Sequence, residues 1–102
     1  GEFENTADFV DASHQLTSEG MLDAFIIKLD NSGVPVWLKQ IGGVNSEKAM
    51  SLDIDGLGNL YVSGGFGFST EPTGADPSAI DFNLSDGPPD VYTTLNRADL
   101  FI

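Results

Sequence analysis

Apolar and polar residues alternate along the middle of the chain, between residues 23 and 66. In the segment Asp23–Leu29, the side chains of Phe25, Ile27 and Leu29 fall on one face of an extended backbone. This period of two is typical of β-strands that bury one face. The same pattern predicts strands over residues 23–29, 34–41, 48–55 and 60–63.

Two turns of matching sequence connect these strands in pairs. The first turn reads Leu29-Asp30-x-x-Gly33 and the second reads Ile54-Asp55-x-x-Gly58, 25 residues later. The aspartate side chain can accept hydrogen bonds from its own turn, and glycine readily adopts a positive φ. The sequence therefore predicts two successive β-hairpins that form an internal repeat.

The flanking segments are less periodic. Residues 1–9 read as an irregular strand end and a loop, and residues 10–22 read as a loop. Residues 67–89 hold four of the five prolines and predict another loop, with Ile80–Phe82 as a short apolar island. Beyond it, we expect a brief extended piece at residues 90–94 and the start of a strand at residues 99–102.

Three phrases in the chain resemble a known bacterial repeat. They read DAFIIKLD-x-SG at residues 23–33, W-x-KQIGG at residues 37–43 and GNLYVSG at residues 58–64. Together they resemble the β-propeller repeat called the SBBP, or seven-bladed β-propeller, repeat. The resemblance covers about residues 23–66 well and the flanks loosely, and the Pro- and Asp-rich segment 68–89 departs from its pattern.

The resemblance implies an all-β fold of antiparallel, four-stranded propeller blades. Residues 1–43 then form the outer part of one blade. Residues 48–102 form the inner strands and the start of the third strand of the next blade, with residues 67–89 as an inserted loop. About one and a half blades cannot close a propeller, which needs about 4 to 8. We therefore expect a fragment of a larger protein, completed by other blades or other protein chains.

The charge of the chain restricts its partners. Among 102 residues, 16 Asp and Glu face only 4 Lys and Arg, so the formal net charge is −12. Phosphate binding needs clustered cations, so we expect no nucleic-acid partner. The sequence has no run of about 18 apolar residues, so we expect no membrane insertion. The absence of cysteine excludes disulfides and thiolate chemistry.

Acidic residues of the Pro-rich segment suggest one cofactor, Ca²⁺, which prefers oxygen ligands. The candidate ligands are Asp76, Asp81, Asp86 and Asp90. Their spacing matches no EF-hand loop, so a solvated acidic surface is the favoured interpretation. Asp53 and Asp55 resemble the opening of a calcium loop, but no acidic residue closes it, which favours a hairpin turn.

Other patterns resemble catalytic or binding motifs, but a structural interpretation is favoured for each. His14 lies near Asp11 and Ser13, but neighbours in sequence do not make a triad, and an exposed loop histidine is favoured. The glycines of residues 64–67 lack the lysine of a phosphate loop. No carboxylate pair stands out for glycoside hydrolysis. We expect core packing rather than ligand stacking from Phe25, Trp37, Tyr61 and Phe66.

These observations favour a non-enzymatic scaffold or interaction module. The resemblance implies a bacterial protein outside the cell or on its surface, as in large proteins exported by type IX secretion. Its partners would be protein or carbohydrate, bound by the loops, with residues 68–89 as the first candidate surface. One alternative is a blade of a propeller glycosidase or lyase whose catalytic residues lie mostly in other blades. Another is a repeat stabilised by Ca²⁺.

Overall fold

The fold consists of antiparallel β-strands, as the sequence predicts. A computed structural model describes residues 1–69, 79–82, 84, 91–94 and 98–102, and these contain no helix. No membrane-spanning helix is therefore found among the residues so described. The strands are β1 (Glu2–Asp8), β2 (Gln15–Leu29), β3 (Pro35–Ile41), β4 (Ser46–Ile54), β5 (Leu60–Phe68), β6 (Ala79–Asp81), β7 (Val91–Thr93) and β8 (Asp99–Phe101).

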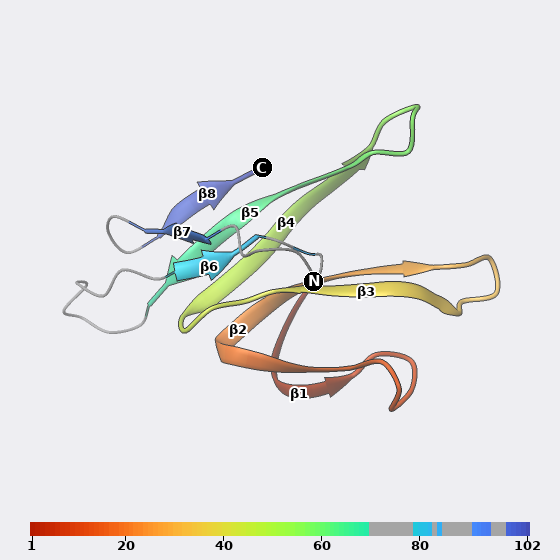
Figure 1. The fold of residues 1–102 in the computed structure, drawn as a ribbon, viewed down its shortest axis with the longest axis horizontal. Helices are drawn as coiled ribbons and strands as arrows, with labels where there is room; N and C mark the ends of the chain where they lie inside the picture. The colour runs from red at the N-terminus through yellow and green to blue at the C-terminus, as the bar shows by residue number, and fades with distance from the viewer. Residues whose placement is uncertain (70–78, 83, 85–90, 95–97) are drawn as a thin grey trace.

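Two three-stranded sheets form the body of the molecule. Their strand orders are β1-β2-β3 and β4-β5-β8, and β6 pairs with β7 in a smaller sheet. Figure 1 shows the two larger sheets joined by the short link between β3 and β4, with β6 close to β5. The predicted hairpins are confirmed as β2–β3 and β4–β5. The sheets do not close into a propeller.

The N-terminal hairpin shows that part of the loop prediction is wrong. β1 runs over most of the predicted strand end and loop, and β2 begins at Gln15, well inside the predicted loop 10–22. This hairpin is largely exposed and is held by polar pairs, including a 3.0 Å bond between the Thr6 and Thr17 hydroxyls and a 2.7 Å bond from Gln15 Nε2 to Asp8 Oδ1. Apolar periodicity cannot reveal such a strand, because neither face of it is fully buried.

The core lies where the two larger sheets meet. Its buried members are Ala24, Ile26, Ile41, Phe66 and Ile80, against which Trp37 and other half-buried apolar side chains pack. Core packing is thus confirmed for Phe66 and Trp37. The other face of β2 carries a separate aromatic cluster, in which the ring of Phe25 lies 4.5 Å from that of Phe9.

Both the fourth strand and Tyr61 are more exposed than the sequence pattern predicts. The alternating apolar side chains of β4, Met50, Leu52 and Ile54, are 62%, 55% and 61% exposed. Tyr61, expected in the core, is 53% exposed. No described strand covers this end of the β4–β5 hairpin, which projects away from the other sheets (Figure 1). These apolar side chains alternate as they do in a buried strand, and in this chain they face solvent.

The C-terminal third differs in part from its prediction. Ile80, predicted as part of an apolar island in a loop, is a buried core residue in β6. The extended piece near residues 90–94 and the strand near residues 99–102 are confirmed as β7 and β8. The rest of the predicted loop lies mainly outside the described residues.

The predicted strand over residues 60–63 is too short. β5 continues through the glycines that follow it and ends at Phe68. A Cβ on Gly64 would collide with the Lys48 carbonyl and the Phe101 ring, so close packing requires glycine there.

Candidate functional site

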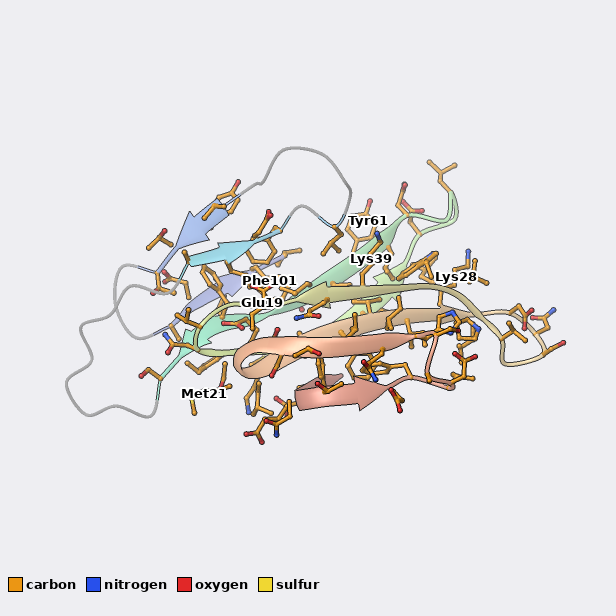
Figure 2. The ribbon with its side chains drawn as sticks, turned by 60° about the horizontal axis from the view of Figure 1, so that its bottom comes forward. Glu19, Met21, Lys28, Lys39, Tyr61 and Phe101 are labelled. Atoms are coloured by element: carbon orange, nitrogen blue, oxygen red, sulfur yellow. The ribbon has the colours of Figure 1, made fainter. Side chains whose placement is uncertain are left out.

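Two acidic side chains are completely buried where β2 meets the start of β4. Asp23 belongs to β2 and Glu47 to β4, and both have 0% exposure. Buried carboxylates are rare unless they are paired or functional. We call Asp23, Asn45 and Glu47 the acidic corner. The backbone N–H of Met21 in β2 donates to the Asn45 carbonyl and so holds β2 beside the residues that lead into β4. Figure 2 labels Glu19 and Met21 in the part of β2 that leads into Asp23.

Asp23 is held by neutral donors on one of its oxygens. Its Oδ2 accepts a 2.6 Å hydrogen bond from Gln40 Nε2 and a 2.9 Å bond from the backbone N–H of Glu19. Gln40 also donates to the Thr17 carbonyl, so its amide links β3 to two points of β2. The other oxygen of Asp23, Oδ1, is buried without a hydrogen-bonding partner.

Glu47 is less well satisfied than Asp23. Its Oε1 accepts a 3.3 Å hydrogen bond from the backbone N–H of Gly67, and its Oε2 has no partner. Burial raises the pKa of Glu47 from 4.5 to about 7, and the charges of Asp23 and Glu19 add to the rise. Backbone hydrogen bonds from Gly67 and Gly43 oppose it. Close to neutral pH, Glu47 therefore exchanges a proton readily.

Two glycines follow the end of β3 beside the acidic corner, and one of them makes room for Asp23. A Cβ on Gly42 would collide with the carboxylate of Asp23. One on Gly43 would come within 2.8 Å of the Ala79 carbonyl and 3.5 Å of Glu47 Oε1. Gly42 therefore permits the burial of the Asp23 carboxylate, whereas Gly43 permits the close approach of the Ala79 backbone and is in ordinary van der Waals contact with Glu47.

Three buried polar side-chain atoms in the described part of the chain lack a hydrogen-bonding partner, and all belong to the acidic corner. They are Asp23 Oδ1, Asn45 Nδ2 and Glu47 Oε2. Each such atom in a native fold calls for an explanation, such as a bound water, an ion or a proton. Sequence reasoning missed this site, because Asp23 reads as the first residue of a strand and Glu47 as part of a polar connector.

The candidate calcium ligands do not form a site within the described residues. Asp81 is an exposed residue of β6, and Asp76, Asp86 and Asp90 lie outside the part of the chain that the structure describes. In that part, no three His, Asp or Glu side chains cluster closely enough to hold a metal ion by themselves. Calcium binding by these four residues stays a prediction.

The Asp55 turn is confirmed as a structural hairpin turn. Its carboxylate accepts hydrogen bonds from the backbone N–H groups of Leu57 and Asn59, from Asn59 Nδ2 at 2.8 Å and from the Tyr61 hydroxyl. The hydrogen bond from the Asn59 side chain is the largest cause of a lowered Asp55 pKa. The oxygens of Asp55 are thus engaged by its own turn.

The first hairpin repeats this geometry. Asp30 accepts hydrogen bonds from the backbone N–H groups of Ser32 and Val34 at 2.8 and 2.9 Å. Gly33 and Gly58, which occupy matching positions, have φ of 80° and 84°. The internal repeat seen in the sequence is therefore also a repeat in backbone conformation and hydrogen bonding.

The structure does bring Asp11, Ser13 and His14 together. His14 Nδ1 lies 2.8 Å from Asp11 Oδ1 and 3.1 Å from the Ser13 hydroxyl. The hydrogen bond from Ser13 is the largest cause that lowers the pKa of Asp11 to about 2. A catalytic triad needs the carboxylate and the hydroxyl on opposite ring nitrogens, whereas here both contact Nδ1. Asp11, Ser13 and His14 therefore form an exposed turn held by hydrogen bonds to the Asp11 carboxylate.

Two further features bear on ligand binding. Gly64 to Gly67 lie inside β5 and are buried, so they do not form a phosphate-binding loop at a helix N-terminus. An apolar groove of about 980 Å³ runs between the sheets, lined by Ile26, Leu60, Phe66, Phe82, Tyr92 and Phe101 among others. No protein-family model, curated protein or solved structure matches the chain.

Proposed function

We propose that the chain is a segment of an extracellular β-propeller repeat protein that serves as a scaffold or interaction module. The observation that carries the proposal is the repeated hairpin. β2–β3 and β4–β5 share the Asp-x-x-Gly turn, its hydrogen bonds to the aspartate carboxylate and its positive-φ glycine. Repeated units of this kind bury their apolar faces by stacking against neighbouring units.

The exposed apolar face of β4 supports this interpretation. Met50, Leu52 and Ile54 alternate in sequence along β4, whose register with β5 shifts between Ala49 and Ser51, and they remain more than half exposed. A further hairpin of the same repeat is the occupant that we propose for this face. Strand order β4-β5-β8 also supports the proposal, since a propeller blade is a similar antiparallel sheet with one more strand.

An interaction role follows from the proposed architecture. In repeat folds, loops at the ends of strands carry most binding sites, and protein or carbohydrate would bind there. The inserted segment 68–89, apart from the buried Ile80 of β6, is the candidate contact surface. The acidic, cysteine-free composition is compatible with a protein outside the cell. Catalysis by residues of other blades gains no support from the described residues.

Binding of a dye that recognises apolar surfaces tests whether the exposed face of β4 is built to pack against another hairpin. We expect the 102-residue chain to bind the dye 8-anilinonaphthalene-1-sulfonate and to self-associate as its concentration rises, measured by sedimentation velocity. Replacing Met50, Leu52 and Ile54 by threonine should reduce both signals. Leu57→Ser, at a turn that is 90% exposed, is the control and should change neither. A sharp, concentration-independent melt of a monomer that binds no dye would refute the proposal.

A further inference from the structure

We propose that the acidic corner is a binding site for one Ca²⁺ ion, held by Asp23 and Glu47 and assisted by Asn45. The argument starts from uncompensated charge. Neither carboxylate forms an ion pair within the part of the chain that the structure describes. Lys48, the residue after Glu47, pairs instead with Glu2 at 3.6 Å.

The groups that surround the two carboxylates are neutral or acidic. Gln40 and the backbone N–H groups of Glu19 and Gly67 are neutral donors, and the Glu19 side chain adds negative charge. Two buried carboxylates in this setting strongly favour a neutralising partner, since an isolated buried charge costs several kcal/mol. A divalent cation neutralises both at once.

The unpaired atoms point to how the ion is held. Asp23 and Glu47 each keep one oxygen without a hydrogen-bonding partner, and both side chains are fully buried. Asn45 has a buried amide nitrogen that also lacks a partner. Nitrogen and oxygen of an amide exchange places when the group turns by 180°, which presents Asn45 Oδ1 instead.

An all-oxygen donor set favours Ca²⁺ over transition metals, which prefer imidazole or thiolate. Ca²⁺ takes 6 to 8 oxygen ligands in flexible geometry, and backbone carbonyls or water fill the positions that side chains leave open. Two carboxylates and one amide would supply the side-chain part of this ligand set. This site differs from the acidic residues of the Pro-rich segment, and the proposal does not depend on the propeller interpretation.

A proton on Glu47 is the alternative to Ca²⁺ as the partner that neutralises charge in the acidic corner. If Glu47 holds a proton, one negative charge disappears without a metal, and Ca²⁺ must displace that proton to bind. The two partners are distinguished by pH. Binding of Ca²⁺ should be tighter at pH 8 than at pH 5.5, whereas neutralisation by a proton alone gives no response to Ca²⁺ at either pH.

The test is a calcium titration of the full chain at pH 8 after treatment with a chelator. We expect millimolar CaCl₂ to raise Tm by about 5 °C over NaCl of equal ionic strength. Equilibrium dialysis should find one bound Ca²⁺ per chain. MgCl₂ should act more weakly, because Mg²⁺ is smaller and dehydrates reluctantly. No difference between CaCl₂ and NaCl, together with no retained calcium in dialysis, overturns the proposal.

Matched variants locate the site. Glu47→Gln and Asp23→Asn keep the shape of the side chain and remove its charge, so each should abolish the calcium-dependent rise in Tm. Glu47→Gln should still fold, because it removes a buried charge. Asp53→Asn and Glu4→Gln change exposed acids and should keep the full response. An equal response in Glu47→Gln and the wild type would place calcium elsewhere, and dialysis of the wild type decides the question if a variant fails to fold.

Discussion

The carboxylates of the two hairpin turns and those of the acidic corner are the same chemical group, but the first lie in turns that face solvent and the second are buried. Asp55 sits in a solvent-facing turn, where Asn59 and backbone N–H groups bond its carboxylate and lower its pKa. Glu47 lies in the interior, where its Oε2 has no hydrogen-bonding partner, and burial raises its pKa to about 7. The supply of donors and water around a carboxylate, rather than the carboxylate itself, decides whether a fold is stabilised by its charge.

The comparison separates structural acids from acids that need a partner. In the turns, each carboxylate is satisfied by neighbours within a few residues, so the turn is complete by itself. In the corner, the donors come from β2, β3 and β5, and they leave one oxygen of each acid unsatisfied. An incomplete shell of this kind is typical of a site that binds a proton, a water molecule or an ion.

The largest effect is expected from filling the space beside Asp23. In Gly42→Val, the new side chain must push the Asp23 carboxylate away from Gln40 and the Glu19 N–H, because a Cβ already collides with it. We expect a loss of about 3 kcal/mol in the free energy of unfolding. Urea denaturation followed by circular dichroism measures it.

Gly56→Ala is the matched control for that change. Nothing lies within 4 Å of a Cβ placed on Gly56, and this glycine has no positive φ. Its effect should stay within about 0.5 kcal/mol of the wild type. Equal losses in the two variants would show that the acidic corner is not tightly packed.

The next effect is a loss of stability as pH rises. Between pH 4.5 and about 7, folded Glu47 keeps a proton that the unfolded chain has released, so the free energy of unfolding falls through this range. The shift corresponds to a loss on the order of 3 kcal/mol once pH exceeds 7. Denaturation at pH 5 and pH 8, both with chelator, measures it, and Glu47→Gln should remove most of the difference.

The lowered pKa values of Asp11 and Asp55 act in the opposite direction. Their stabilisation is present above pH 3.8 and is lost as pH falls through the lowered folded-state pKa of each group, which for Asp11 is about 2. Stability without calcium should therefore be greatest between about pH 3.8 and pH 4.5. A wild-type protein that becomes steadily more stable from pH 5 to pH 8 would contradict the assignment of a buried, protonated Glu47.

The same contrast explains what the sequence could and could not predict. Asp30 and Asp55 are followed three residues later by glycine, a local signal of a turn, so the hairpins were predictable. Asp23 and Glu47 carry no local signal, because their burial depends on strands far apart in sequence and, for Asp23, on Gly42. The polar strands of the N-terminal hairpin were missed for a related reason, since their stability comes from cross-strand pairs rather than from an apolar face.

The smallest expected effect compares the two repeated turns. The Asp55 carboxylate accepts hydrogen bonds from Leu57, Asn59 and Tyr61, whereas Asp30 accepts them from Ser32 and Val34 only. Asp55→Ala should therefore lower Tm by a few degrees and Asp30→Ala by roughly half as much. Thermal melts at pH 6 measure both, with Asn31→Ala as an exposed control in the first turn. Equal decreases in Tm would mean that the side-chain bonds from Asn59 and Tyr61 add nothing, and a larger decrease for Asp30→Ala would contradict the predicted order.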